Sequence, residues 1–408
     1  MNASAEAGRR GADVRSDCWV KITPTDSEGI KIQMNSKVKS MYGASIKDLV
    51  MKGLKIFKFS HAIVEIEDSG ALPFTIMARI ETAVKRLNPK KTKQWIPEIK
   101  KYSSYDSSRD RFRRSRLYLP GNEPKFIVNS GIHKPDGIIL DLEDSVASSE
   151  KDAAQILVRN ALCQVNFYGA ERMVRINQIP KGLADLKYIV PYNVHVILIP
   201  KCENPEQVKQ VDSEVQKITK KNNVNHEIYY MPIIESALGA IHAYEIAKAS
   251  PKIVALTIGL EDYTADIGTQ RTVEGCESFW ARSQVVNAAR AAGVQPIDTV
   301  FSDVTDMEGL KQSVLEAKSL GFEGKGCIHP RQIQVIHEAF APTPEEIEKA
   351  KKTVIAFEEA EAKGLGVVSL GSKMIDPPVV KRAQRNIKLA LETGKLSSDW
   401  RQGGVQNG

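Results

Sequence analysis

Residues 228–262 read IYYMPIIESALGAIHAYEIAKASPKIVALTIGLED, which is two apolar runs separated by a helical stretch. The first run ends in Glu235 and the second ends in Asp262. Short apolar runs that alternate with helical stretches are typical of buried parallel strands joined by helices. The segment therefore predicts a strand–helix–strand unit in which each strand ends in a carboxylate.

The same alternation continues on both sides of this segment. Eight strand-like runs separated by amphipathic stretches, in about 215 residues, predict an α/β protein with a (β/α)8 TIM barrel. A doubly wound open sheet is the competing architecture, but no Gly-x-Gly-x-x-Gly turn follows the first strand. The runs are RLYLP (116–120), GIILDLED (137–144), MVRIN (173–177), VHVILIP (194–200), IYYMPIIE (228–235), VALTIGLED (254–262), IDTVF (297–301) and GCIHP (326–330).

Nearly every run ends in residues that can bind a ligand or catalyse a reaction. The carboxyl ends of the strands of a barrel converge on one face, where the active sites of such enzymes lie. We therefore expect these residues to share one site: Gly121, Asn122, Asp141, Glu143, Asp144, Arg175, Asn177, Lys201, Glu203, Glu235, Glu261, Asp262, Ser302, Asp303 and His329.

Glu235 and Asp262 end consecutive strands, 262 − 235 = 27 residues apart. Adjacent strand ends can share one cation, and two carboxylates without a nearby His or Cys suit a hard, oxygen-preferring ion such as Mg²⁺. Each carboxylate alone could instead cap a helix or form a salt bridge. Because the two occur together on neighbouring strands, we favour a metal site.

Arg175 follows a strand rich in valine and isoleucine, and its guanidinium could hold a substrate carboxylate through two parallel hydrogen bonds. Pairing with Asp141 or Glu143 is the alternative. We expect Asp141 and Asp144 to support the site from behind its ligand-binding residues. His329 precedes a proline in an apolar context, so we expect a structural histidine with no catalytic role. An Mg²⁺ ion beside an arginine suits aldol or Claisen cleavage of a substrate that chelates the metal.

Composition excludes several classes of protein. The 408 residues are 42% hydrophobic and 26% charged, as in globular chains, and the net charge of +7 is too small to indicate nucleic acid binding. The five cysteines form no Cys-x-x-Cys pair, which excludes a disulfide framework or a zinc cage. No run approaches the roughly 18 apolar residues of a membrane-spanning helix, and the N-terminus lacks the apolar centre of a signal peptide. We expect a cytoplasmic protein without a membrane partner.

The sequence pattern divides the chain into three segments. They are a small α+β domain at residues 1–87, a basic linker at residues 88–113, and the barrel with a C-terminal helical extension at residues 114–408. The linker contains prolines, serine clusters and many Lys and Arg residues, so it is either mobile or a docking surface for an acidic partner subunit or a nucleotide-like cofactor. As a random coil it would span about 30 Å. The N-terminal domain is predicted to contain strands at 20–22, 30–34 and 62–68, a helix at 37–57, and a strand that continues into a helix at 72–87.

The barrel resembles the citrate lyase beta subunits of the HpcH/HpaI aldolase family from Arg114 to about Leu391. The resemblance implies a barrel that assembles with other subunits, Mg²⁺ held by Glu235 and Asp262, and substrate contacted by Arg175 and Glu235. In related malyl-type lyases an aspartate of a similar C-terminal segment reaches a neighbouring subunit's site and takes part in proton transfer, and Asp376 matches its position. A charge at the N-terminus of a helix, before Pro377, is the alternative role for Asp376. The matching motifs are RRSRLYLPGNEPKF, DGIILDLEDSV, VRIN, IPKCENPEQV, IIESALGA, GLEDYTADIGTQRT, DTVFSDVTDMEGL, GFEGKGCIHPRQI and GLGVVSLGSKMIDPPVV.

The first 87 residues resemble the citrate lyase acyl carrier protein, the gamma subunit, in SDCWVKI, IQMNSKVKSMYG and EDSGALPFTIMARIETAV. That resemblance implies a serine that carries a phosphoribosyl-dephospho-coenzyme A arm, for which Ser16 is the candidate and Ser4 a weaker one. The family places one residue between this serine and an aspartate. Ser16 instead directly precedes Asp17, and Arg15 occupies the usual serine position.

The implied reaction is cleavage of a citryl-thioester to oxaloacetate and an acetyl-thioester within a citrate lyase complex. A citrate lyase alpha subunit would exchange the acyl groups on the carrier, and the chain would form a homo-oligomer within that complex. A citramalyl-thioester lyase that releases pyruvate and a lyase that acts on free coenzyme A thioesters are the enzyme alternatives. A carrier and assembly protein with an inactive barrel is a third, although the presence of Arg175, Glu235 and Asp262 argues against it.

Overall fold

The computed structural model describes residues 3–362, 368–370 and 373–401. These residues form two compact units, Met1–Ile333 and Gln334–Gly408. The first unit contains the N-terminal domain and the barrel. The second unit contains the C-terminal helices and is described by itself.

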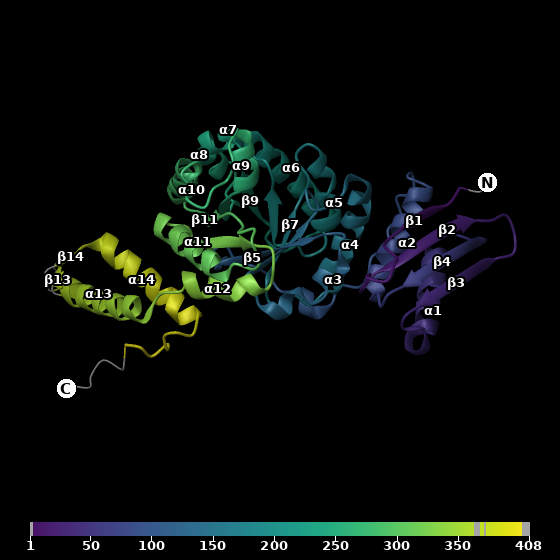
Figure 1. Cartoon of the computed structure of the whole chain (residues 1–408), viewed down its shortest axis with the longest axis horizontal. Coiled ribbons are helices and arrows are strands. Elements are labelled where there is room, and N and C mark those ends of the chain that lie inside the picture. The colour runs from purple at the N-terminus through teal and green to yellow at the C-terminus, as the bar shows by residue number, and fades with distance from the viewer. Residues whose placement is uncertain (1–2, 363–367, 371–372, 402–408) are drawn as a thin grey trace. The chain divides into compact units, whose positions relative to one another are not determined.

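Eight parallel strands form a closed barrel in the first unit (Figure 1). The strands follow one another in chain order, and the last pairs with the first through Lys325 and Ser115. The (β/α)8 prediction is therefore confirmed, and an open sheet is excluded. The strands are β5 (Ser115–Pro120), β6 (Gly137–Asp141), β7 (Glu171–Arg175), β8 (Val196–Ile199), β9 (Tyr229–Ile234), β10 (Ala255–Ile258), β11 (Gln295–Asp298) and β12 (Gly324–Cys327).

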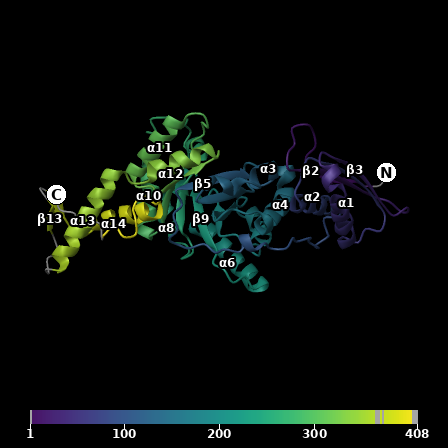
Figure 2. The same cartoon turned by 90° about the horizontal axis from the view of Figure 1, so that it is seen from below.

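Helices cover the outside of the strands, as the two perpendicular views show (Figures 1 and 2). The strands are therefore buried on both faces, which explains their nearly continuous apolar sequence. Ile139, Leu198 and Ile297 belong to the apolar cluster that fills the barrel interior. The helices of the first unit are α3 (Pro124–Ile127), α4 (Lys151–Gln164), α5 (Leu186–Ile189), α6 (Pro205–Asn222), α7 (Ala237–Ile241), α8 (Ala243–Ala247), α9 (Leu260–Asp266), α10 (Phe279–Ala292) and α11 (Met307–Leu320). The next helix, α12 (Arg331–Phe340), begins in the first unit and continues into the second.

The turn after β9 is fixed by local hydrogen bonds. Ser236 is the N-cap of α7, and its hydroxyl accepts a hydrogen bond from the backbone N–H of Gly239 at 3.1 Å. The N–H of Ala237 donates to Asp266 at 2.8 Å. Capping of this kind satisfies N–H groups that a helix start leaves without partners. The direction of the chain immediately after Glu235 is thereby set.

The N-terminal domain packs two helices against a four-stranded sheet of order β1-β2-β4-β3. One expectation was wrong: residues 73–87 are helical throughout, with Pro73 at the helix start. The segment is apolar on more than one face because α2 contacts both the sheet and α4, and every residue from Phe74 to Val84 is buried. The elements are β1 (Ala5–Ala7), β2 (Cys18–Pro24), β3 (Ile30–Ser36), α1 (Lys39–Ile56), β4 (Ala62–Asp68) and α2 (Pro73–Leu87).

A buried ion pair joins the N-terminal domain to the barrel. Glu81 of α2 accepts hydrogen bonds from both terminal nitrogens of Arg159 of α4, at 3.0 and 2.8 Å, and neither side chain is exposed. Lys85 contacts the same carboxylate at 2.7 Å, and the backbone N–H of Trp95 donates to it at 2.7 Å. A second contact, at the edge of the interface, pairs Arg86 with Asp152 at 2.7 Å.

Residues 88–113 lie against both domains. Trp95 is buried in the core of the N-terminal domain, and the backbone N–H of Lys100 donates to Cys163 of α4 at 2.9 Å. Arg113 is fully buried and forms a salt bridge to Glu171 at 2.7 Å. The structure thus differs from the random coil that the composition suggests, because these side chains find apolar and acidic partners on the surfaces that they cross.

The second unit pairs α13 (Pro344–Ala362) with α14 (Pro377–Glu392) and contains the short hairpin of β13 (Val368–Leu370) and β14 (Lys373–Ile375). Val354, Ala383 and Ile387 belong to the apolar cluster between the helices. Residues 364–367 and 371–372 of the motif GLGVVSLGSKMIDPPVV lie outside the described residues.

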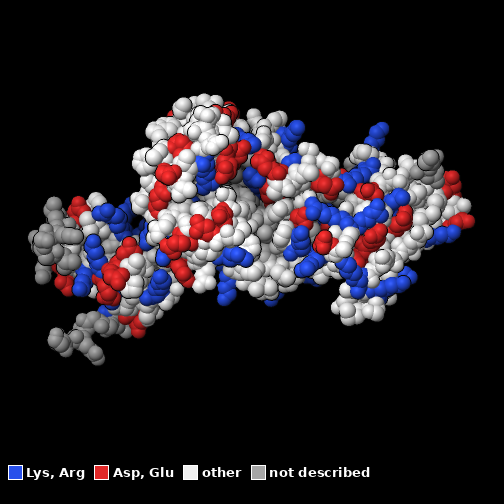
Figure 3. All heavy atoms as spheres, in the orientation of Figure 1, with Lys and Arg blue, Asp and Glu red and all other residues white. Residues whose placement is uncertain are grey.

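Surface charge is mixed on the face in Figure 3, where Lys and Arg are interspersed with Asp and Glu. Within the described ranges, no helix combines the length and apolar character needed to span a bilayer.

We predict that Arg159→Met destabilises the first unit by about 3 kcal/mol, because the substitution leaves the buried Glu81 carboxylate without its main counter-ion. Urea unfolding measures the loss. The double variant Glu81→Met/Arg159→Met should recover most of it, whereas Arg86→Met at the interface edge should cost about 1 kcal/mol or less. Equal losses for Arg159→Met and Arg86→Met would contradict the role of the buried pair.

A second prediction concerns His195, which anchors residue 105 of the linker to the barrel. Its Nδ1 accepts from the backbone N–H of Arg172 at 3.1 Å, and its Nε2 lies 2.8 Å from the carbonyl oxygen of Tyr105 and 2.6 Å from the Arg172 guanidinium. Burial, together with the Arg172 charge, lowers the pKa of His195 to about 3. The folded state therefore binds fewer protons than the unfolded state.

The His195 contribution to stability is complete above the unfolded pKa of about 6.5 and is lost as the pH falls toward 3. At pH 5 the loss should be about 2 kcal/mol relative to pH 7. Urea unfolding at both pH values tests this, with His195→Gln as the variant that cannot titrate. If the variant and the wild type lose equal stability between pH 7 and pH 5, His195 is not the responsible group.

Candidate active site

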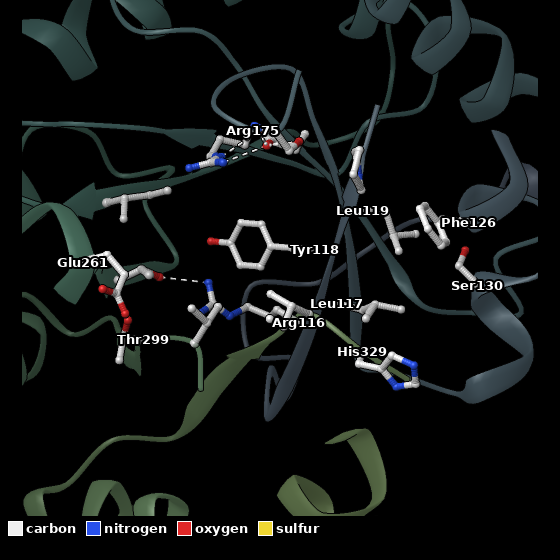
Figure 4. A pocket seen from close by; sticks show the side chains of 18 of the residues that line it. Arg116, Leu117, Tyr118, Leu119, Phe126, Ser130, Arg175, Glu261, Thr299 and His329 are labelled. Carbon is white, nitrogen blue, oxygen red and sulfur yellow. Dashed lines mark hydrogen bonds and ion pairs between the residues drawn. The ribbon is translucent and has the colours of Figure 1, made fainter. Parts of the chain in front are cut away.

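A cavity of about 660 Å³ opens at the carboxyl ends of the barrel strands (Figure 4). Its walls come from β5, β6, β7, β9, β10 and β11 and from the loops that follow them. Arg175, Glu235 and Asp262 all line it. The structure thus brings together three residues that the sequence predicts at one site.

Glu235 lies at the end of β9 and is only 6% exposed. Its Oε2 accepts a hydrogen bond from the backbone N–H of Lys201 at 2.8 Å. Burial raises the pKa of Glu235 to about 8, and the Lys201 N–H and the Arg175 charge offset this only in part. A Cβ at Gly259 would come within 2.6 Å of Glu235 Oε1, so the glycine leaves the space that this carboxylate occupies.

Asp262 is in the first turn of α9, and its carboxylate lies 3.2 Å from Nζ of Lys201. The same ammonium lies 3.8 Å from Asp144 and 3.9 Å from Glu143. Lys201 therefore links the acidic loop after β6 to Asp262, while its backbone holds Glu235.

Arg175 at the end of β7 forms two hydrogen bonds to Asp141, each 2.7 Å long, and its Nη1 lies 2.8 Å from Glu143 Oε2. Asp141 thus holds the Arg175 guanidinium, as we expect of a residue that supports a ligand-binding side chain. Burial alone would lower the pKa of Arg175, but the Asp141 carboxylate outweighs it and raises the pKa above the ordinary value. The two hydrogen bonds use two of five guanidinium donors, so donors remain for a ligand.

Negative charge is in excess at this end of the barrel. Among the described residues, five acidic side chains accompany two cationic side chains at this end, and the raised pKa of Glu235 agrees with the absence of a cationic side chain at its own carboxyl group. The remaining carboxylates still outnumber the cations, and carboxylates this close repel one another unless a further cation is present. Oxygen donors in this arrangement fit a divalent ion such as Mg²⁺. No cluster of three or more His, Cys, Asp and Glu with metal-binding geometry occurs in the described parts of the chain. The carboxylates are Asp141, Glu143, Asp144, Glu235 and Asp262, and the cations are Arg175 and Lys201.

Ser16 lies in the loop between β1 and β2 with a backbone φ of 55°, and its side chain is partly exposed. The following residue, Asp17, is buried and pairs with Arg79, which also donates to the carbonyl oxygen of Asn122 at 3.0 Å. Asn122 lies in the loop after β5 and does not line the cavity, whereas Pro120 before this loop and Lys125 after it do. The Arg79 guanidinium therefore joins the Ser16 loop to this barrel loop. Ser4 is exposed ahead of β1.

Two further residues from the sequence prediction, Asp376 and His329, accept hydrogen bonds from backbone N–H groups close to them in sequence. Asp376 belongs to the second unit, where its side chain caps α14 by accepting from the N–H of Val379 at 3.2 Å. His329 lines the cavity, and its Nδ1 accepts from the backbone N–H of Arg331 at 3.2 Å. Burial lowers the pKa of His329.

Sequence reasoning missed Arg116 and Tyr118, which line the cavity from β5 (Figure 4). Alternate residues of a strand face the same side, so the inward direction of Tyr118 also fixes that of Arg116. The sequence signal that could have identified Arg116 is an arginine at an inward-facing position of a buried strand. Lys201 was noted as a strand-end residue, but its links to three carboxylates depend on the fold.

The comparisons with protein families match both parts of the chain. Residues 114–330 match the family described as HpcH/HpaI aldolase/citrate lyase. Residues 6–87 match an acyl carrier family described as malonate decarboxylase delta subunit (MdcD). The predicted fusion of a carrier-type domain with a barrel of this family is confirmed.

Curated relatives include citrate lyase subunit beta of Haemophilus influenzae, which is 42% identical over 70% of this chain and 98% of its own length. The mitochondrial citramalyl-CoA lyase of Mus musculus is 33% identical over 71% of this chain and 89% of its own length.

Among solved structures, protein CitE of Mycobacterium tuberculosis in complex with magnesium, acetoacetate and coenzyme A has a TM-score of 0.58 and 28% identity. The match covers 69% of this chain and 99% of that chain. Since the family match spans more than half of the sequence and the relatives are covered almost completely, the chain belongs to the HpcH/HpaI aldolase/citrate lyase family.

Proposed function

We propose that this chain cleaves a citryl-thioester to oxaloacetate and an acetyl-thioester. The observation that carries the proposal is the strand-end constellation of Arg175, Glu235 and Asp262 in one cavity of a barrel that is 42% identical to a citrate lyase beta subunit. A base takes the hydroxyl proton, the O–H electrons form the ketone of oxaloacetate, and the bond between the hydroxyl-bearing carbon and the carbon next to the thioester breaks. The electron pair of that bond passes into a thioester enolate, which takes up a proton on carbon to give the acetyl-thioester.

Glu235 and Asp262 would hold Mg²⁺, which the excess of carboxylates at this site favours. When bound, Mg²⁺ supplies Lewis-acid stabilisation of the oxygen on which negative charge develops. The Lys201 ammonium would release Asp262 and remain near Glu143 and Asp144. The magnesium complex of the Mycobacterium tuberculosis protein supports this choice of ion.

Arg175 would hold a substrate carboxylate with the donors that Asp141 leaves free. Asp141 fixes the guanidinium from behind, so the orientation of the bound carboxylate depends on that pair. Glu235 would contact the substrate as well as the ion. Asp376 would transfer a proton in the site of a neighbouring copy, which requires a homo-oligomer.

The N-terminal domain would carry the acyl group on a phosphoribosyl-dephospho-coenzyme A arm attached to Ser16. The contact from Asp17 through Arg79 to Asn122 supports this assignment, because it holds the Ser16 loop beside the short loop that connects cavity-lining residues of β5 and α3. An alpha subunit of the citrate lyase type would load the carrier. The citramalyl-CoA lyase relatives make a citramalyl-thioester the second candidate substrate.

The activity test is release of oxaloacetate from a citryl-thioester by the purified full chain with Mg²⁺. We predict that chelation of the metal abolishes release and that added Mg²⁺ restores it. Glu235→Gln and Asp262→Asn should each lower kcat/KM at least 100-fold, because a lost ligand costs more than a lost supporting contact.

The control is Glu206→Gln at the start of α6, because this carboxylate lies outside the cavity lining, pairs with Lys209 at 2.9 Å and is mostly exposed. Calorimetric titration should show Mg²⁺ affinity reduced at least tenfold in Glu235→Gln and changed less than threefold in Glu206→Gln. Unchanged Mg²⁺ affinity in Glu235→Gln would exclude Glu235 as a ligand.

The carrier assignment predicts a covalent adduct after co-expression with arm-attaching enzymes of a citrate lyase system. Intact mass should increase by one phosphoribosyl-dephospho-coenzyme A, and peptide fragmentation should map it to Ser16. Ser16→Ala should lose the adduct, whereas Ser4→Ala should keep it. An unmodified chain, with enzymes that modify a control carrier, would reject the assignment and favour free coenzyme A thioesters as substrates.

A further inference from the structure

One arginine of the cavity wall has no carboxylate partner. Arg116 of β5 is fully buried. Its Nη1 lies 3.0 Å from Thr257 Oγ1 and 3.1 Å from Met231 Sδ, and its Nη2 lies 3.3 Å from the carbonyl oxygen of Asp298. Its Nε has no hydrogen-bond partner among the described residues. A buried guanidinium held only by neutral groups is costly unless a counter-ion joins it.

The side chain of Asp298, whose backbone carbonyl contacts Arg116, already has cationic partners. Asp298 lies 2.7 Å from Nζ of Lys325 and 3.2 Å from Nε of Arg282, and Arg282 also pairs with Glu316. Two carboxylates therefore balance two cations in this part of the barrel. The Arg116 charge remains in excess.

Tyr118 lies two residues further along β5 and presents its hydroxyl to the cavity (Figure 4). Its ring centre is 5.6 Å from the Arg175 guanidinium carbon. Burial raises the pKa of Tyr118, although the Arg116 and Arg175 charges oppose the shift. The hydroxyl therefore stays protonated at neutral pH and can donate a hydrogen bond to an anion.

The cavity lining thus contains two kinds of charge imbalance. The residues that follow β6 to β10 include more acidic than cationic side chains, whereas Arg116 of β5 has no carboxylate partner. A ligand that complements both binds a cation through one group and carries a carboxylate on another. A citryl group has such an additional carboxylate at the end of a carboxymethyl arm. A citramalyl group has a methyl group in place of that arm.

We propose that Arg116 and Tyr118 form a second anion subsite that selects an acyl group with a carboxymethyl arm over one with a methyl group. The inference rests on the proposed function and specifies its substrate. Tyr118 donates a hydrogen bond to the additional carboxylate. Arg116, which is enclosed, acts as a specificity-determining residue through its charge, which water screens little at this depth.

Malate and lactate test the subsite without turnover, because they differ by the same carboxymethyl and methyl groups. Calorimetric titration of the full chain with Mg²⁺ should show tighter binding of malate than of lactate. Arg116→Met should weaken malate binding about 10- to 100-fold, the range of a hydrogen bond or ion pair with a charged group, and lactate binding less than threefold. Tyr118→Phe should weaken malate binding about tenfold.

Thermal unfolding separates this role from a structural one. Removal of an unpaired buried charge should leave the Tm of Arg116→Met unchanged or raise it. Arg116→Lys should retain part of the preference for malate. Arg290→Met, which removes a surface partner of Glu323, is the matched control and should behave as wild type. A lowered Tm in Arg116→Met with an unchanged malate-to-lactate ratio would show a structural arginine and overturn the proposal.

Failure of the inference and failure of the proposed function give different results. If the wild type cleaves a citryl-thioester and Arg116→Met keeps its preference over a citramalyl-thioester, the subsite is rejected and the lyase remains. If the wild type cleaves neither thioester but Arg116→Met loses the preference for malate, the dicarboxylate subsite stands and the lyase is rejected. A wild type that binds malate no better than lactate overturns the inference directly.

Discussion

The excess of carboxylates at the carboxyl ends of β6 to β10 is the constraint on which the site depends. Arg175 and Lys201 are the cationic side chains paired with this acidic group, and each contacts more than one carboxylate. The backbone of Lys201 also holds Glu235. The Arg175 guanidinium and the Lys201 ammonium therefore hold together residues at the ends of four strands, β6, β7, β8 and β10. A divalent cation would complete the charge balance and give the buried Glu235 carboxylate a partner.

At the β5 wall the unbalanced charge is positive. Arg116 is buried beside Thr257 and Met231, which offer no charge to balance it. A methionine would fill similar volume without the cost of burying a charge, so stability alone does not explain an arginine there. A carboxylate on the ligand does explain it. One ligand then complements both the acidic residues after β6 to β10 and Arg116. That ligand binds a cation and carries a further acid group.

Much of this arrangement follows from sequence pattern, and the rest depends on contacts that no pattern encodes. The alternation of apolar runs and helices predicts the barrel, and the strand-end rule brings Arg175, Glu235 and Asp262 to one cavity. The pattern fails at residues 72–87, where a helix buried on several faces reads like a strand followed by a helix. It also cannot reveal that Lys201 reaches Asp262, because that contact joins residues 61 positions apart (262 − 201) through the curvature of the barrel.

The junction between the domains changes what the N-terminal domain can do. The linker composition suggests a flexible tether that lets a carrier move over about 30 Å. The buried pair of Glu81 and Arg159 opposes separation of the domains, since separation would expose two charges whose partners lie across the junction. The burial of Trp95 in the core of the N-terminal domain holds that part of the linker against the domain. Transfer of an acyl group between sites would then depend on the length of the arm rather than on movement of the domain. Under the proposed function, an arm on Ser16 would favour cleavage in the same chain, whereas an exchange partner would have to approach the docked domain from its free side.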